Sequence, residues 1–361
     1  MEVSSTGDTR ILKQYMTVGS LYHTYKRIRS LQTHRISALP IVLLMPHSAC
    51  NCRCVMCDIW KGNNQLKQLA VEDVEHLTSS LRKLGTRQVV FSGGEALLHE
   101  NFFRFCEILK QLDLEITLLS TGLTLQKNTS QLLKWVDEII VSLDGDEETH
   151  DKIRNIPGAF RKLHDGISSI KAVDPAFPIS ARTVIHKLNY KKWPAIIDTS
   201  KEWGLDQISF LPADVSSHAF NREQLWDKSK QNDLLIDKGE LPALQEVIDF
   251  IIDKYSDQIK SGSISENAEK LQKIYAYYSA FHGLNAFPWK KCNAPWVSAV
   301  MEADGSIRPC FFHEAYGNLH ESTLDTVINK PSAINFRKQL DIDRNDICIK
   351  CVCYLNLSPL K

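Results

Sequence analysis

The sequence predicts an α/β fold, a partial (β/α)6 TIM-like barrel followed by a small cysteine-rich domain at the C-terminal end. From residue 41 onward, short β-branched runs alternate with longer segments of helical periodicity, which is the pattern of a βα repeat. Six such strands form a partial barrel of parallel strands. We expect the strands over 41–46, Gln88–Phe91, Glu115–Leu119, Glu138–Leu143, Ile179–Ile185 and Gln207–Leu211.

Helical segments fit between these strands and beyond the last one. Gly85 and Gly204 predict where two of the helices end. We expect helices over Val71–Leu84, Phe102–Leu112, Phe160–Val173, Trp193–Trp203 and Leu241–Tyr255. An N-terminal amphipathic helix that carries Tyr15, Leu21, Tyr22, Tyr25 and Ile28 is expected to pack on the barrel exterior. The chain is thus divided into an N-terminal helix and linker (1–38), the barrel (39–214), a helical bridging region (215–288) and the cysteine-rich domain (289–361).

Composition limits the classes of partner. The chain has 361 residues and is 43% hydrophobic, which is enough for a sizeable core. Its 43 basic residues balance 43 acidic ones, so bulk charge predicts neither a nucleic-acid nor a membrane partner. No run resembles a membrane span or a signal-peptide core, and the ten cysteines are typical of a reducing compartment. We therefore expect a cytoplasmic protein.

Four cysteines within eight residues follow the first predicted strand, in the stretch Cys50-Asn-Cys52-Arg-Cys54-Val-Met-Cys57. Taking Cys50, Cys54 and Cys57 gives the spacing Cys-x3-Cys-x2-Cys, which can place three thiolates around one iron–sulfur cluster and leave one iron without a protein ligand. A structural zinc site is the alternative, but such a site usually has two separated cysteine pairs. A disulfide between the near neighbours Cys52 and Cys54 would have poor geometry.

This cysteine loop, with its tail Cys57-Asp-Ile-Trp60, resembles that of the radical S-adenosylmethionine (SAM) superfamily. Phe91-Ser-Gly-Gly-Glu95 resembles the second signature of that family, which meets the methionine amino group. The resemblance implies one 4Fe-4S cluster that binds SAM, held by Cys50, Cys54 and Cys57. It also implies cofactor contacts at the ends of successive strands: Ser92, Gly93, Gly94, Glu95, Ser120, Ser142, Asp144, Arg154 and Arg182. Arg182 and Arg154 are rivals for the methionine carboxylate, since a guanidinium suits it.

Five more cysteines lie in the C-terminal region. Asp304-Gly305 predicts a β-turn between two strands, which would bring Cys292 and Cys310 together, and Cys348 and Cys351 supply a second pair. The layout resembles the shortened auxiliary-cluster domain called Twitch, because the full SPASM domain needs additional cysteines. The resemblance implies a second 4Fe-4S cluster held by Cys292, Cys310, Cys348 and Cys351, with Cys353 as a rival ligand. A zinc ribbon is the alternative. Cys106, on a predicted helix among phenylalanines, is interpreted as a core thiol.

The resemblance implies a radical enzyme that cleaves SAM to a 5'-deoxyadenosyl radical and abstracts hydrogen from its substrate. An external one-electron donor of the flavodoxin or ferredoxin type would reduce the first cluster. We expect a peptide or natural-product substrate and a net oxidation. A redox-neutral epimerase or rearrangement enzyme, and a non-catalytic iron–sulfur or zinc protein, are the alternatives. Candidates for the group that accepts the released proton are His47, His186, Asp214 and His313.

Overall fold

The computed structural model describes residues 18–222 and 224–359. Its centre is one nine-stranded sheet with the order β6-β5-β4-β3-β2-β1-β7-β8-β9. All six predicted strands are present, and they pair in parallel with their neighbours. The strands are β1 (Ile41–Leu44), β2 (Gln88–Phe91), β3 (Glu115–Ser120), β4 (Glu138–Ser142), β5 (Ile179–Ile185), β6 (Gln207–Pro212), β7 (Ser298–Met301), β8 (Ser306–Arg308) and β9 (Gly317–Asn318).

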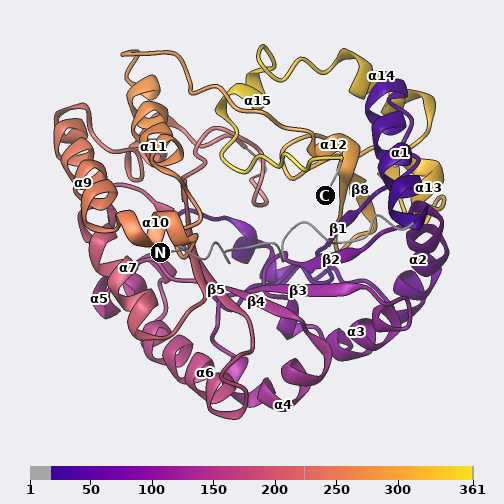
Figure 1. Ribbon diagram of the computed structural model, residues 1–361, viewed down its shortest axis with the longest axis horizontal. Coiled ribbons are helices and arrows are strands. Elements are labelled where there is room, and N and C mark those ends of the chain that lie inside the picture. Colours follow the sequence, from indigo (N-terminus) through magenta and orange to yellow (C-terminus); the bar gives the residue numbers. More distant parts are fainter. Residues whose placement is uncertain (1–17, 223, 360–361) are drawn as a thin grey trace, which may run out of the picture.

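Helices cover one face of this sheet. Figure 1 shows α2 to α7 in an arc outside strands β1 to β6, while the C-terminal segment, in yellow, lies across the opposite, open side of the arc. The helices are α1 (Val18–Thr33), α2 (Val71–Leu84), α3 (Phe102–Lys110), α4 (Leu125–Trp135), α5 (Glu147–Arg154), α6 (Ala159–Val173), α7 (Trp193–Glu202), α8 (Lys228–Asn232), α9 (Leu241–Lys254), α10 (Ser256–Ser261), α11 (Ala268–Phe281), α12 (Ala294–Val297), α13 (Leu324–Val327), α14 (Pro331–Gln339) and α15 (Asp346–Lys350). A partial TIM-like barrel is therefore confirmed.

Alternation of burial along the strands separates the two faces of the barrel sheet. In β4, Ile139 and Val141 are fully buried, whereas Ile140 and Ser142 are only half-buried. The fully buried side chains form one core with Leu132 and Leu163 of the outer helices. Each such aliphatic side chain contributes about 1.5–3 kcal/mol on burial. The half-buried set faces the barrel interior, which leaves that side for a ligand. Cys106 is fully buried in the same core, as the sequence predicts.

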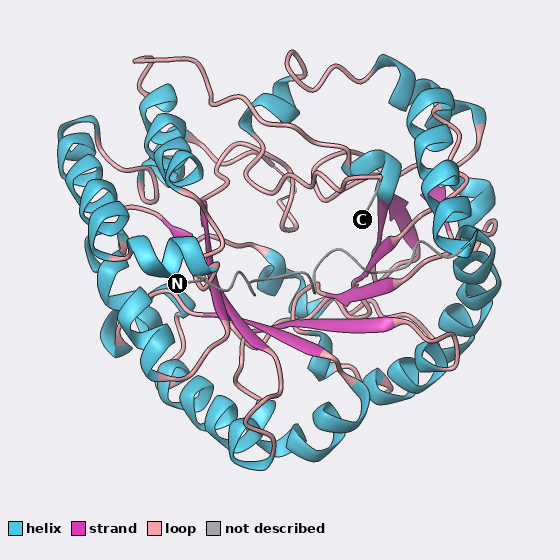
Figure 2. Cartoon of the chain, in the orientation of Figure 1, coloured by secondary structure: helices cyan, strands magenta, loops and turns pink. Residues whose placement is uncertain are grey.

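The cysteine-rich region extends the barrel sheet. Strand β7 pairs in parallel with β1, with Ile41 opposite Ser298, and Met45 donates its backbone N–H to Met301 at 2.8 Å. Strands β7 and β8 form the antiparallel hairpin that Asp304-Gly305 predicts, and Gly305 has a φ of 80°. Figure 2 shows these strands continuing the barrel strands at one side of the molecule. The pairing of β7 with β1 joins residues far apart in sequence, and no local pattern predicts it.

Helix α1 contacts α12 of the C-terminal region, and the Arg27 guanidinium donates to the carbonyl of Ser358 at 3.4 Å. Tyr22 and Tyr25 are 56% and 58% exposed, so they do not form the packing face of this helix. Tyr15, also assigned to the helix from sequence, lies outside the described residues. Over 18–222 and 224–359, no helix is long and apolar enough to span a membrane.

Candidate active site

The predicted cofactor residues gather where the parallel strands end. The cysteine loop follows β1, the Gly-Gly-Glu segment follows β2, and Ser120 and Ser142 are the last residues of β3 and β4. Active sites of parallel barrels form at this edge because the loops after the strands meet there.

The cysteine loop is held by hydrogen bonds from side chains of the segment that follows it and from backbone groups. Asn63 accepts from the backbone N–H of Cys50 at 3.0 Å and donates to its carbonyl at 2.9 Å, and Trp60 donates to the carbonyl of Cys57 at 2.9 Å. Backbone N–H groups also point at two of the sulfurs, from Cys52 to Cys50 Sγ and from Ile59 to Cys57 Sγ, both at 3.5 Å. Such donors stabilise the thiolates of iron–sulfur sites.

The cysteine thiols differ in their acidity. Burial raises the pKa of Cys50 to about 12 and also raises that of Cys57. The Cys52 thiol lies beside the Cys54 sulfur, and this hydrogen bond lowers the pKa of Cys54 to about 6. Cluster assembly must therefore displace protons from Cys50 and Cys57, as thiolate ligation generally requires.

Glu95 is a fully buried carboxylate that ties two loops together. Its oxygens accept from Ser120 Oγ at 3.0 Å, from the backbone N–H of Thr121 at 2.7 Å and from Thr121 Oγ1 at 2.7 Å. Its own backbone N–H donates to the Ala49 carbonyl at 2.9 Å, beside the cysteine loop. The side chain of Glu95 therefore braces the site, and its loop presents backbone groups of Ser92, Gly93 and Gly94 next to the cysteines.

Asp144 and Arg154 form an ion pair with each other, at 0% and 8% side-chain exposure. Burial acts to lower the pKa of Arg154. The Asp144 carboxylate opposes this effect, and the pKa is raised above its usual value. Arg154 also donates to Cys54 Sγ at 3.5 Å, and its carbonyl accepts from Arg53 at 3.0 Å. The pair thus positions the cysteine loop. Arg154 is occupied by protein partners, whereas the rival Arg182 has no carboxylate partner among the described residues.

Ser142 and Arg182 are neighbours in the register of β4 and β5, and both are half-buried between fully buried residues. They therefore face the barrel interior. Arg182 makes one weak side-chain hydrogen bond, from Nε to Ser209 Oγ at 3.4 Å. These two side chains are placed to meet a ligand inside the barrel, together with the half-buried Ser92.

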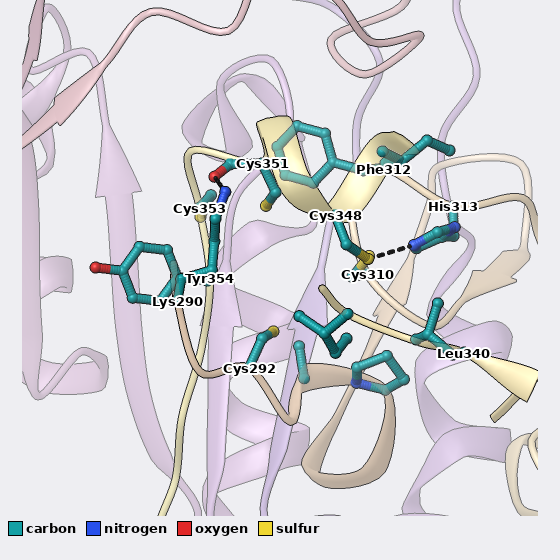
Figure 3. A pocket seen from close by; sticks show the side chains of 14 residues that line it. Lys290, Cys292, Cys310, Phe312, His313, Leu340, Cys348, Cys351, Cys353 and Tyr354 are labelled. Atoms are coloured by element: carbon teal, nitrogen blue, oxygen red, sulfur yellow. Dashed lines mark hydrogen bonds between the residues drawn. The ribbon is translucent and has the colours of Figure 1, made fainter. Parts of the chain in front are cut away.

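A second cavity lies in the C-terminal region and is lined by five cysteines, Cys292, Cys310, Cys348, Cys351 and Cys353. Figure 3 shows the sulfurs of the first four directed into a common space, while Cys353 lies at the edge beside Tyr354. Cys353 is also the one of these five that is exposed. Burial raises the pKa of Cys310 to about 11 and that of Cys348 to about 12.

The backbone around this cavity is fixed by polar contacts. Lys290 donates to the carbonyls of Ile349 and Cys351 at 2.8 and 2.7 Å, and His313 Nε2 lies 3.3 Å from Cys348 Sγ. Within the described part of the chain, no three His, Cys, Asp or Glu side chains are close enough to hold a single metal ion. A cluster is larger than an ion, and both cysteine sets fit the donor chemistry of one.

The four predicted proton acceptors do not meet in one place. His47 and His186 each accept a backbone N–H from two residues ahead, at 2.9 and 3.3 Å, and Asp214 forms a buried ion pair with Arg222. His313 belongs to the cysteine cavity. Burial lowers the pKa of His186 to about 3, which makes it a weak base. Each of the four side chains thus has a contact within the protein, and a role as proton acceptor stays a prediction.

Another pocket lies between the barrel and the C-terminal segment, and sequence reasoning missed its acidic residue. Its lining comes from three parts of the chain. These are Arg182, Ser209 and Leu211 of the barrel, Glu266 just before α11 with Lys270 in the first turn of that helix, and Cys351, Cys353 and Tyr354. Glu266 precedes a helix in a region without strand periodicity, so nothing in the sequence marks it.

Fold and site together define an iron–sulfur enzyme built on a partial parallel barrel. Two protein families match this chain. Residues 44–199 match the radical SAM superfamily, and residues 292–352 match the iron–sulfur cluster-binding domain SPASM. The chain is a radical SAM enzyme with a C-terminal SPASM-type domain, and its cofactors are SAM and iron–sulfur clusters. The preference for the shortened Twitch form stays a prediction.

Curated relatives are distant and diverse. Fe-coproporphyrin III synthase of Methanosarcina barkeri is 25% identical over 86% of this chain and 80% of its own length. The subtilosin biosynthesis protein AlbA of Bacillus subtilis is 20% identical over 78% of this chain and 58% of its own length. Among solved structures, Streptococcus suis SuiB bound to the precursor peptide SuiA has a TM-score of 0.64 at 15% identity, covering 96% of this chain and 79% of that chain. The SuiB match shows the fold.

Proposed function

We propose that this enzyme abstracts a hydrogen atom from a peptide or natural-product substrate and that the overall reaction is an oxidation. When bound, the clusters and SAM supply hydrogen-atom abstraction and one-electron transfer. Cys50, Cys54 and Cys57 would hold the cluster that meets SAM, and Cys292, Cys310, Cys348 and Cys351 the second cluster. Ser142 and Arg182 would bind the cofactor from the barrel interior, beside the loop of Gly93 and Gly94.

One observation carries the proposal. The pocket between the barrel and the C-terminal segment is bounded by barrel strands on one side and by Cys351 and Cys353 on the other. A substrate in this pocket would lie beside the second cysteine set and against strands β5 and β6 of the barrel. Oxidation needs an electron acceptor near the substrate, and a cluster with four protein ligands suits electron transfer better than substrate coordination. Lys270 lines the same pocket and would attract a carboxylate-bearing molecule.

The relatives support the peptide class. The sporulation killing factor maturation protein SkfB and the subtilosin biosynthesis protein AlbA both resemble this chain, and the SuiB structure contains a precursor peptide. An external flavodoxin or ferredoxin would supply the reducing electron. The cytoplasm is the compartment we propose, because all ten cysteines are unpaired in the structure.

A tetrapyrrole that carries carboxylates is a second candidate substrate. The relative Fe-coproporphyrin III synthase aligns with most of this chain. The cationic side chains of the pocket favour such a ligand equally well, so the two substrate classes must be separated by experiment.

The test is a reaction under strict anaerobiosis. Reconstituted enzyme with dithionite and SAM should release 5'-deoxyadenosine and methionine slowly even without substrate. Short peptides encoded beside the gene, and in a parallel arm a carboxylate-bearing iron tetrapyrrole that is a precursor of Fe-coproporphyrin III, are then added. The accepted substrate should yield a product two hydrogens poorer, with one SAM consumed per turnover. A product of unchanged mass that carries a solvent-derived hydrogen would establish a redox-neutral reaction instead. Absence of SAM cleavage with intact clusters would rule out the enzyme assignment.

A further inference from the structure

The pocket between the barrel and the C-terminal segment contains one carboxylate among its described residues, that of Glu266. The chain before α11 runs beside the edge strand β6. Ile208 donates its backbone N–H to Ser263 at 2.8 Å and accepts from Ser265 at 2.9 Å. This pairing adds a short parallel extension to the sheet and brings the next residue, Glu266, to the pocket.

The Glu266 side chain is fixed at one oxygen and open at the other. Oε2 accepts the backbone N–H of Phe210 at 3.0 Å, which satisfies an edge-strand donor. No other described residue donates a hydrogen bond to Oε1. A carboxylate held this way has little freedom to turn, and its second oxygen is left for a molecule in the pocket.

We propose that Glu266 is the base that accepts the proton released when the substrate is oxidised in this pocket. The inference rests on the proposed function. Once a hydrogen atom has been removed from substrate carbon, the substrate radical loses one electron and one proton as a new double bond forms. A cluster held by Cys292, Cys310, Cys348 and Cys351 would supply the one-electron acceptor, and the Glu266 carboxylate takes the proton from the adjacent O–H, N–H or C–H. Both acceptors then border the same space.

The electrostatics suit this role near neutral pH. Burial raises the pKa of Glu266 to about 7, and the Phe210 hydrogen bond and the charges of Lys270 and Arg182 oppose the rise. A base is most effective when its pKa lies near the working pH. The other titratable groups lining the pocket are Lys273, Tyr277, Lys290, Cys351, Cys353 and Tyr354. Of these, Lys273 pairs with Glu269 at 2.9 Å, and Lys290 is bound to two carbonyls.

The four side chains predicted from sequence are less suitable than Glu266 as acceptors of the proton released in this pocket. None of His47, His186, Asp214 and His313 lines this pocket. Two of the imidazoles use a ring nitrogen within their own turn, and Asp214 is neutralised by Arg222. Glu266 alone combines access to the pocket with an open oxygen.

The experiment compares Glu266→Gln, Glu266→Asp and the control Glu269→Gln in the reconstituted holoenzyme. Glu269 lies one turn away in α11, and its side chain is 75% exposed. Infrared titration, which needs no substrate, should show a protonated-carboxyl band with a midpoint near pH 7 in wild type and in E269Q. The band should be absent in E266Q. Iron content and circular dichroism confirm that each variant is folded.

Turnover is measured with whichever probe, peptide or precursor iron tetrapyrrole, gives the product two hydrogens poorer. The wild-type rate should rise with pH through about 7, because the base must be ionised. E266Q should lower kcat by about 100-fold or more and lose this pH dependence, E266D should restore part of the rate, and E269Q should leave it unchanged. Oxidation at an undiminished rate by E266Q, or a missing infrared band in wild type, overturns the role of Glu266 as the base. The proposed function of the enzyme is unaffected by either result. No oxidised product from wild type overturns the proposed function and this inference with it.

Discussion

Two buried side chains near the cysteine loop, Asp144 and Arg154, contact each other as an ion pair. The resemblance to radical SAM enzymes implies that both contact the cofactor. In the structure they neutralise each other in the interior, and Arg154 reaches Cys54. A motif identifies such residues because they are near the chemistry, but it does not reveal whether they touch the ligand or support the residues that do.

Arg154→Met tests this support. Removing the guanidinium leaves the buried Asp144 carboxylate without its cationic partner, although Oδ1 still accepts from the Val184 backbone N–H. This should lower the free energy of unfolding by about 3–5 kcal/mol. The double variant Asp144→Asn/Arg154→Met removes both charges and should recover most of that loss. Urea denaturation of anaerobic protein measures it. Arg161→Met, at a side chain that is 76% exposed, is the control and should leave the midpoint unchanged. Equal losses in the single and double variants would contradict an ion pair.

Among the structural elements, the loops after β1 and β2 fit together through glycine. The resemblance to radical SAM enzymes implies that the glycines of the Gly-Gly-Glu segment contact the cofactor. The structure gives Gly94 a second reason, since a Cβ at this position would lie 2.0 Å from the Ala49 carbonyl oxygen. The loop that carries the cysteines and the loop of the Gly-Gly-Glu segment are therefore packed backbone to backbone.

Gly94→Ala should displace the cysteine loop. The added methyl group overlaps a backbone atom, which cannot move away as a flexible side chain can. We expect the variant to hold less iron at the first site and to lose SAM cleavage, with a destabilisation of about 1–3 kcal/mol for overpacking. Gly239→Ala is matched, since its Cβ would meet no atom within 4 Å. Iron analysis and 5'-deoxyadenosine release measure the effect. Normal iron and cleavage in Gly94→Ala would show that the two loops can separate.

The strands illustrate what the sequence can predict. The six barrel strands and the β7–β8 hairpin have local signals, namely β-branched runs and an Asp-Gly turn, and all are present. The pairing of β7 with β1 and the approach of residues 263–266 to β6 depend on contacts between distant segments. For that reason the cysteines of the site could be predicted, whereas Glu266 could not.

For the whole molecule, the continuous sheet joins the two elements that lead to the two cysteine sets. Strand β1 leads into the loop of Cys50, and its neighbour β7 leads through β8 toward Cys310. Because β1 and β7 are hydrogen-bonded, the two sets are fixed relative to each other by backbone geometry. The pocket beside Cys351 and Cys353 is lined by strands of this same sheet.

Iron counting tests this two-site arrangement. Reconstituted protein should hold about eight irons per chain, and replacing Cys50, Cys54 and Cys57 by alanine should leave about half, because the other set keeps its own ligands. Replacing Cys292, Cys310 and Cys348 should likewise leave about half, and the remaining cluster should still cleave SAM. The exposed Cys353→Ala is the control, and it should keep the full count if Cys351 is the fourth ligand. Elemental analysis and visible absorption measure these quantities. Stoichiometric zinc beside a single cluster would mean that the C-terminal cysteines form a zinc site, and the electron acceptor required for the proposed oxidation would then be missing.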